Sequence, residues 1–117
     1  MRRIRWTTEA ANEFEAALTY VQQDKPDAAR QLANAVVDRI ERLATLPGTG
    51  RLGEVKGTRE LIVSPYVVVY RYTDEIVEIL HIWHGALRLA IATGLPLDAF
   101  EIIKQRADSA HLSRDIP

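Results

Sequence analysis

Residues 66–72 read Tyr-Val-Val-Val-Tyr-Arg-Tyr, and after the link Thr73-Asp74-Glu75 the chain continues as Ile-Val-Glu-Ile-Leu-His-Ile-Trp-His over residues 76–84. Both runs are rich in β-branched and aromatic residues, which predicts two strands. Residues 58–63 are the candidate for a third strand. The turn at Ser64-Pro65 separates this segment from the strand that begins at residue 66. Links this short join antiparallel strands, whereas parallel strands need a long crossover. We therefore expect an antiparallel meander in the second half of the chain.

The first half of the chain predicts one strand and two helices. Arg3–Thr7 alternates apolar and polar residues with the period of a strand. Residues 8–23 and 26–45 carry apolar residues at helical spacing, and Pro26 suits the first position of the second helix. The short link between them predicts an antiparallel hairpin. The order β-α-α-β-β-β predicts an α+β fold, in which a four-stranded antiparallel sheet packs against the N-terminal helical hairpin.

Two segments lie outside these regular patterns. Pro47–Gly53 holds three glycines and one proline in seven residues, which predicts a loop with a defined path. After Gly94-Leu95-Pro96, a further helix is expected at about 97–107, from the helical spacing of Leu97, Phe100, Ile103 and Ala107. We expect one domain in residues 1–88 and a C-terminal extension in residues 89–117. The helix of the extension would fold back over the sheet or form a homodimer contact.

Composition restricts the class of protein. The 117 residues carry 15 Lys and Arg against 16 Asp and Glu, so the formal net charge is -1, which argues against a strongly basic nucleic-acid binder. The absence of cysteine excludes disulfides and thiolate chemistry, and it favours a reducing cytoplasm. The apolar runs are too short to span a membrane, so no membrane partner is expected.

Several short motifs follow one another in a fixed order between residues 2 and 88. The helical hairpin contains Asp27-Ala28-Ala29 and ends on Leu43-x-x-Leu46-Pro47-x-x-Gly50-Arg51. It is followed by Gly50-Arg51-Leu52-Gly53-Glu54-Val55, Gly57-Thr58-Arg59-Glu60-Leu61, Pro65-Tyr66-Val67-Val68-Val69-Tyr70-Arg71, Val77-Glu78-Ile79-Leu80 and His84-Gly85-Ala86. In order and spacing these motifs resemble the RelE/ParE superfamily of bacterial toxins. The resemblance implies a toxin of a type II toxin-antitoxin system, with a cognate antitoxin encoded beside it.

That superfamily contains two different activities. One branch enters the ribosomal A site and cuts messenger RNA, which requires a base, an acid and cations that stabilise the phosphorane. The other branch poisons DNA gyrase by binding and has no catalytic set. Because a fold does not select between activities, the choice depends on particular residues.

His84 is the main candidate for acid–base chemistry. It ends the last predicted strand, an imidazole transfers protons near neutral pH, and some nuclease members keep a histidine at the matching position. Arg71 and Arg59 would assist His84 if the chain is a nuclease. Alternatively, His84 bonds a neighbouring backbone group. The candidates for binding nucleic acid or another target are Arg51, Lys56, Arg59, Arg71 and Arg88. The alternative for these side chains is pairing with surface carboxylates, and Arg51 could hold its loop closed.

Other positions argue against a nuclease. Nuclease members have an arginine directly after the tyrosine that corresponds to Tyr66, whereas this chain has Val67. Arg71 is about 13 Å farther along an extended strand, too far to replace it. Glu54 is a possible general base, although a solvated loop glutamate is the simpler interpretation. His81 and His84 would lie on opposite strand faces and share no metal, and we expect no cofactor.

These features favour a ParE-like inhibitor of DNA gyrase, or of another macromolecular target, that a cognate antitoxin neutralises. The alternative is a RelE-like, ribosome-dependent mRNA endonuclease. The balanced charge supports the first hypothesis, since residues 1–88 carry 12 basic and 12 acidic side chains.

Overall fold

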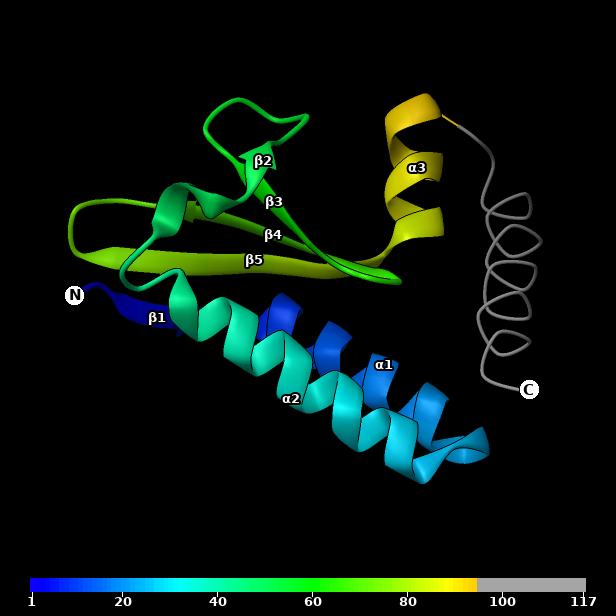
Figure 1. Cartoon of the computed structure of the whole chain (residues 1–117). Helices are drawn as coiled ribbons and strands as arrows, with labels where there is room; N and C mark the ends of the chain where they lie inside the picture. The colour runs from blue at the N-terminus through cyan, green and yellow to red at the C-terminus, as the bar shows by residue number, and fades with distance from the viewer. Residues whose placement is uncertain (95–117) are drawn as a thin grey trace.

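A computed structural model describes residues 1–94, with the side chains of residues 1–89 and 94. The described chain forms an α+β fold in which two long helices cover one face of a sheet (Figure 1). Its elements are β1 (Arg3–Trp6), α1 (Thr8–Asp24), α2 (Pro26–Arg42), the 3₁₀ turn η1 (Pro47–Thr49), β2 (Arg51–Leu52), β3 (Arg59–Val63), β4 (Tyr66–Tyr72), β5 (Ile76–His84) and α3 (Gly85–Thr93).

The expected α+β class is confirmed, but the sheet is mixed and has five strands in the order β1-β5-β4-β3-β2. β3, β4 and β5 form the predicted antiparallel meander, and β2, which was not predicted, pairs antiparallel with β3. β1 is instead parallel to β5, with Arg3 opposite Ile76 and Trp6 opposite Ile79. The helical hairpin carries the chain from β1 to the opposite edge of the sheet. The meander then crosses back strand by strand, and its last strand, β5, lies beside β1 and runs in the same direction as β1. The fifth strand, β2, has only two residues and is too short to show an alternating pattern.

The two long helices are joined by Lys25 alone and pack side by side (Figure 1). The hydroxyl of Thr7 caps α1 by accepting the backbone N–H of Ala10 at 3.1 Å. α2 ends at Arg42, three residues before its predicted end. There the N–H of Leu43 donates to the carbonyl of Ile40 at 2.9 Å, a bond to the third residue back, which tightens the last turn.

The core lies between the helical hairpin and the sheet. Alternate strand residues point into it, as the period of a strand requires. The helices contribute Ala10, Ala17, Val36, Ile40 and Leu43, and the strands contribute Leu61, Val63, Tyr66, Val68, Tyr70, Val77, Ile79 and Ile82. Each fully buried large side chain adds about 1.5–3 kcal/mol of hydrophobic stabilisation. These side chains therefore hold the helical hairpin on one face of the sheet, and the other face remains open.

A β-bulge interrupts β5 opposite β4. Val69 pairs with His81 and Tyr70 pairs with Ile79, so Leu80 is the extra residue. Leu80 and His81 therefore both line the open face of the sheet, whereas Ile79 and Ile82 on either side belong to the core. The bulge changes which side chains of β5 reach the open face.

β5 leads directly into α3, a helix that the sequence analysis did not predict. The N–H of Gly85 donates to the carbonyl of Pro65 at 2.8 Å, which anchors the start of α3 to the turn before β4. The expected helix at 97–107 lies outside the described residues, and so does most of the extension. Among residues 1–94, no helix has the length and apolar character needed to cross a membrane.

Candidate functional site

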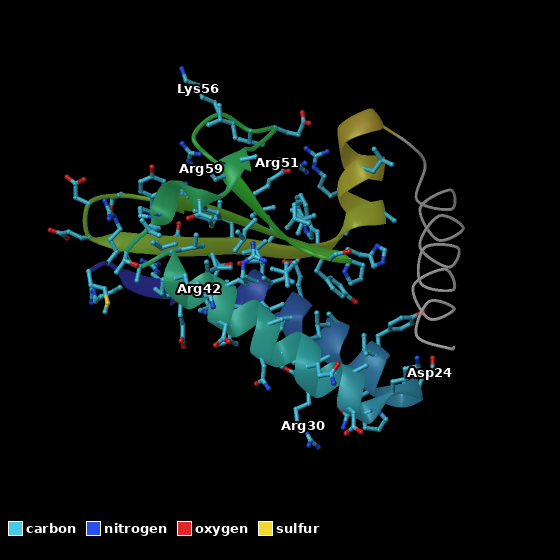
Figure 2. The ribbon with its side chains drawn as sticks, viewed as in Figure 1. Asp24, Arg30, Arg42, Arg51, Lys56 and Arg59 are labelled. Carbon is cyan, nitrogen blue, oxygen red and sulfur yellow. The ribbon has the colours of Figure 1, made fainter. Side chains whose placement is uncertain are left out.

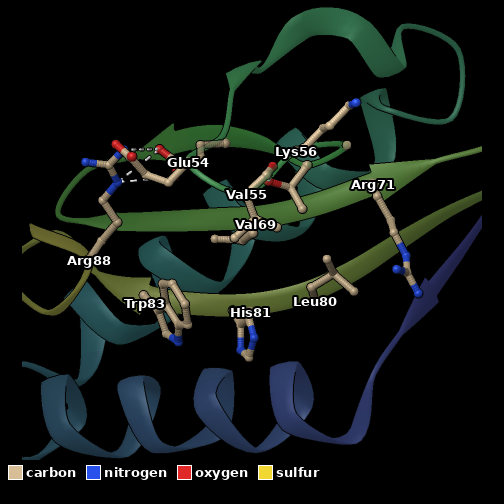
Figure 3. A pocket seen from close by; sticks show the side chains of 12 residues that line it. Glu54, Val55, Lys56, Val69, Arg71, Leu80, His81, Trp83 and Arg88 are labelled. Carbon is tan, nitrogen blue, oxygen red and sulfur yellow. Dashed lines mark hydrogen bonds and ion pairs between the residues drawn. The ribbon is translucent and has the colours of Figure 1, made fainter. Parts of the chain in front are cut away.

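The open face of the sheet holds a groove of about 410 Å³. β4 and β5 form its floor, the loop between β2 and β3 forms one wall, and α3 contributes Arg88 at one end (Figure 3). The lining residues are Glu54, Val55, Lys56, Gly57, Thr58, Glu60, Val69, Arg71, Leu80, His81, Trp83 and Arg88. The groove therefore has an apolar floor with charged groups around its rim, which is the usual composition of a binding site.

In the wall loop, residues 53–58, a backbone hydrogen bond joins the first residue to the last. The N–H of Gly53 donates to the carbonyl of Thr58 at 2.9 Å, and the Thr58 hydroxyl donates to the carbonyl of Val55 at 2.6 Å. Gly57 has a φ of +87°, a conformation that favours glycine. This turn places Val55, which is 68% exposed, and Lys56 at the tip of the hairpin.

The preceding segment, residues 47–50, is fixed by β3 and β4, as the predicted defined path requires, whereas residues 51–52 of the predicted loop form β2. The hydroxyl of Tyr70 donates to the carbonyl of Pro47 at 2.6 Å and accepts the N–H of Gly50 at 2.9 Å. Burial raises the pKa of the Tyr70 phenol, so the hydroxyl keeps its proton and remains a donor. Arg59 donates to the carbonyl of Gly50 at 2.7 Å, so this candidate supports the loop instead of lining the groove.

A buried carboxylate joins two of the candidate arginines. Glu60 is 4% exposed and accepts from Arg51 at 3.0 Å and from Arg88 at 3.1 Å. Arg88 also donates to Glu54 at 2.9 Å (Figure 3). The hydrogen bond to Glu60 raises the pKa of the Arg88 guanidinium. These bonds tie α3 to the wall loop and to β3, and both arginines carry a carboxylate partner.

The two remaining basic candidates differ in their partners. Arg71 donates to Glu78 on β5 at 2.7 Å, so it also has a carboxylate partner, which it shares with Arg5. Lys56 makes no hydrogen bond or ion pair with any residue that the structure describes. It extends into solvent at the tip of the wall loop (Figure 2). Lys56 is therefore the cation of this rim best placed to meet a partner.

His84 lies on the other face of the sheet. It pairs with Tyr66, is 6% exposed, and its Nδ1 accepts the backbone N–H of Ala86 at 3.0 Å. The imidazole packs edge-on against the ring of Tyr66, with centroids 5.5 Å apart. His84 thus caps the first turn of α3, and it does not line the groove that holds Arg71.

A second histidine lies on the floor of the groove. The carboxylate of Glu13 in α1 accepts from His81 Nδ1 at 3.1 Å, from the N–H of Ile82 at 3.2 Å and from Trp83 Nε1 at 2.8 Å. The rings of His81 and Trp83 are stacked, with centroids 4.4 Å apart. Because the Nδ1–H donates to the carboxylate of Glu13, the Nε2 of a neutral His81 remains an acceptor.

The structure thus brings Glu54, Lys56, Arg71 and Arg88 together around one groove and places Arg59 and His84 elsewhere. Arg51 reaches the rim through Glu60. His81 and Trp83 were not predicted as parts of this site. Their alternation along β5 was the available signal, but the bulge at Leu80 determines which face they occupy.

Comparisons with known proteins agree with this fold. The family described as "ParE toxin of type II toxin-antitoxin system, parDE" matches residues 4–88. The proposed toxin Y4kP of Sinorhizobium fredii is 38% identical over 86 residues, which cover 72% of this chain and 88% of Y4kP. Toxin RelE2 of Caulobacter vibrioides is 33% identical over 86 residues, which cover 74% of this chain and 98% of the relative.

Two solved structures share the architecture. A chain of the chromosomal ParDE toxin-antitoxin system from P. aeruginosa matches with a TM-score of 0.65 and 25% identity, over 72% of this chain and 96% of the other. A chain of the RelBE2 toxin-antitoxin complex from Mycobacterium tuberculosis matches in fold, with a TM-score of 0.52 and 24% identity, over 71% of this chain and 96% of the other. On the family match and these relatives, the chain belongs to the ParE toxin family of type II toxin-antitoxin systems, within the RelE/ParE superfamily.

Proposed function

We propose that this toxin acts by binding DNA gyrase, in the manner of the gyrase-directed branch of its superfamily, and that a cognate antitoxin neutralises it. The position of His84 carries the proposal. This histidine, the main acid–base candidate, is buried, caps α3 and lies on the face opposite Arg71. It is therefore unsuited to transfer a proton in the groove.

The environment of the basic side chains supports the same conclusion. Stabilising a phosphorane requires cations directed at the substrate, but Arg51, Arg71 and Arg88 donate to carboxylates, and Val67 occupies the position of the nuclease arginine. The groove retains an apolar floor and Lys56 at its rim. This composition suits the recognition of a protein surface, in which an apolar centre is surrounded by polar groups.

An antitoxin partner is supported by the solved relatives, which come from a ParDE system and from a RelBE2 toxin-antitoxin complex. We expect the product of the adjacent small gene to copurify with this chain and to restore growth. Failure of both would contradict the assignment of that gene product as the antitoxin.

A second candidate function, the ribosome-dependent mRNA endonuclease, is favoured by one observation. His81 lies on the groove floor with its Nδ1 bonded to Glu13, so a carboxylate orients the imidazole and leaves Nε2 as a base. In this alternative His81, and not His84, would be the acid–base residue.

The two functions separate in paired assays on one set of variants. Under the gyrase proposal, the purified toxin inhibits DNA supercoiling, and Lys56→Glu weakens inhibition by about three- to tenfold, the size of one lost rim charge contact. Arg30→Glu, the same charge change on the distant surface of α2, leaves inhibition unchanged (Figure 2). New mRNA 5′ ends in primer extension that disappear with His81→Gln, together with normal supercoiling, would establish the endonuclease instead.

A further inference from the structure

The apolar side chains of the groove come from two sides. The bulge in β5 adds Leu80 to the floor beside His81, and Val69 on β4 pairs with His81. Val55, at the tip of the wall loop, lines the same groove and is 68% exposed (Figure 3). Aliphatic side chains of the wall and of the floor thus border one space, and the fold leaves Val55 largely uncovered.

The wall loop holds Val55 in place before any partner binds. Its carbonyl accepts the N–H of Thr58 at 3.1 Å and the hydroxyl of Thr58 at 2.6 Å. The preceding residue, Glu54, accepts from Arg88 at 2.9 Å, which ties the loop to α3. A side chain on a backbone that is already ordered loses little further conformational entropy on binding. Val55 is therefore suited to contact a partner.

Charge is unevenly distributed along the groove. Both carboxylates that line it bond Arg88 at one end, whereas Lys56 and Arg71 lie at the other end (Figure 3). Lys56 has no carboxylate partner in the described part of the chain, and Arg71 shares its partner, Glu78, with Arg5. The end of the groove at Lys56 is thus positive, and it complements a negatively charged group.

We propose that the groove binds a segment of the protein target in which a bulky apolar side chain lies beside a carboxylate. The apolar side chain lies between Val55 and Leu80, and the carboxylate meets Lys56. This inference rests on the proposed function, because it requires a protein target, and it adds the chemistry by which that target is recognised. It assigns a role in specificity to Val55 and to the residue that the bulge inserts.

The supply of cations favours a carboxylate over a phosphate backbone as the charged group. A nucleic-acid strand brings one negative charge with each nucleotide. Among the described residues that line the groove, Lys56 is the cation without a carboxylate partner. A single carboxylate matches this lysine, and the apolar side chain beside it covers the aliphatic groups of the wall and floor.

Two substitutions of Val55 test the proposal in the full chain. Val55→Glu and Val55→Lys both remove the apolar contact, but they carry opposite charges. Purified gyrase is titrated with each variant, and the concentration that halves DNA supercoiling is measured. We expect Val55→Lys to weaken inhibition by about three- to tenfold, and Val55→Glu to weaken it about tenfold more, because its carboxylate faces that of the bound segment.

The same hairpin offers a matched control. Leu52 in β2 is 77% exposed and does not line the groove, so Leu52→Glu should leave inhibition unchanged. A second pair tests the floor. Leu80→Ala should weaken inhibition by about three- to tenfold, whereas Leu80→Met, which keeps the apolar volume, should retain it. A melting curve like that of the native chain shows that each variant is folded.

Each contrary result has a distinct meaning. If the native chain inhibits supercoiling and both Val55 variants inhibit equally well, the target does not bind in this groove, and only the inference is wrong. Equal losses in Val55→Glu and Val55→Lys would mean that the bound segment has no carboxylate at this end, which also overturns the inference. Self-association of the native chain that Val55→Glu abolishes, with inhibition unchanged, would mean that a second copy occupies the groove. A native chain without effect on supercoiling would contradict the proposed function and this inference together.

Discussion

The hydroxyl of Tyr70 connects β4 to the loop at residues 47–50, and Tyr70→Phe removes this connection without changing the shape of the core. Two hydrogen bonds are lost, to the carbonyl of Pro47 at 2.6 Å and from the N–H of Gly50 at 2.9 Å. Each is worth about 1 kcal/mol net, and the N–H of buried Gly50 is left without a partner, so the expected loss is about 2–3 kcal/mol. For a chain of this size the loss lowers the melting temperature by roughly 8–12 °C.

Thermal unfolding followed by circular dichroism measures this effect in the full-length chain. Tyr72→Phe is the matched control, because Tyr72 is 37% exposed, its hydroxyl makes no hydrogen bond with any described residue, and its ring contact with Arg2 survives the change. We expect this control to melt within about 2 °C of the native chain. If Tyr70→Phe melts no lower than Tyr72→Phe, the phenol does not hold the loop and the reasoning is refuted.

Three further outcomes follow from the contacts of Tyr70, Gly50 and Glu13. The raised pKa of Tyr70 contributes stability that is complete below about pH 10 and is lost as the pH rises through the raised value, so the stability gap between the native chain and Tyr70→Phe should narrow above pH 10 in urea titrations. A Cβ at Gly50 would lie 2.7 Å from the Tyr70 hydroxyl and 2.8 Å from the Glu60 carbonyl oxygen, so Gly50→Ala should cost about 1–3 kcal/mol, whereas Gly48→Ala, whose Cβ would have its nearest neighbour at 3.8 Å, should cost little. Glu13→Ala removes three hydrogen bonds at β5 and should cost about 2–3 kcal/mol and alter tryptophan fluorescence, while Glu15→Ala on the exposed side of α1 should change neither.

The helices and the meander were predictable because their signals are local. The threonine cap of α1, the proline at the start of α2 and the β-branched run of β4 each act within a few residues. The partner of β1 was not predictable in this way, since strands that pair across 70 residues leave no local signal. β2 was missed because two residues cannot display alternation. α3 was missed because its start depends on the long-range bond between Gly85 and Pro65.

The site was predictable in its residue types but not in its geometry. The basic side chains at residues 56, 71 and 88 do line one groove, yet the sequence contains no signal for the carboxylates that neutralise two of them across strands. Which histidine lies in the groove depends on which residues of β5 face the open side of the sheet. A bulge adds one residue, so it determines that His81 lies on the open face, and no residue type in this stretch requires a bulge at Leu80.

The pairing of arginines also changes what the net charge of -1 implies. A protein that binds nucleic acid gains affinity by releasing one counterion for each phosphate that an available cation neutralises. Here Glu54, Glu60 and Glu78 already pair with Arg51, Arg88 and Arg71 within the fold. The arginines at the groove thus already have carboxylate partners, and Lys56 alone would contribute about one unit to the dependence of log affinity on log salt. Under the proposed function, the protein target gains most of its affinity from the apolar floor, as protein surfaces commonly do, and depends little on salt.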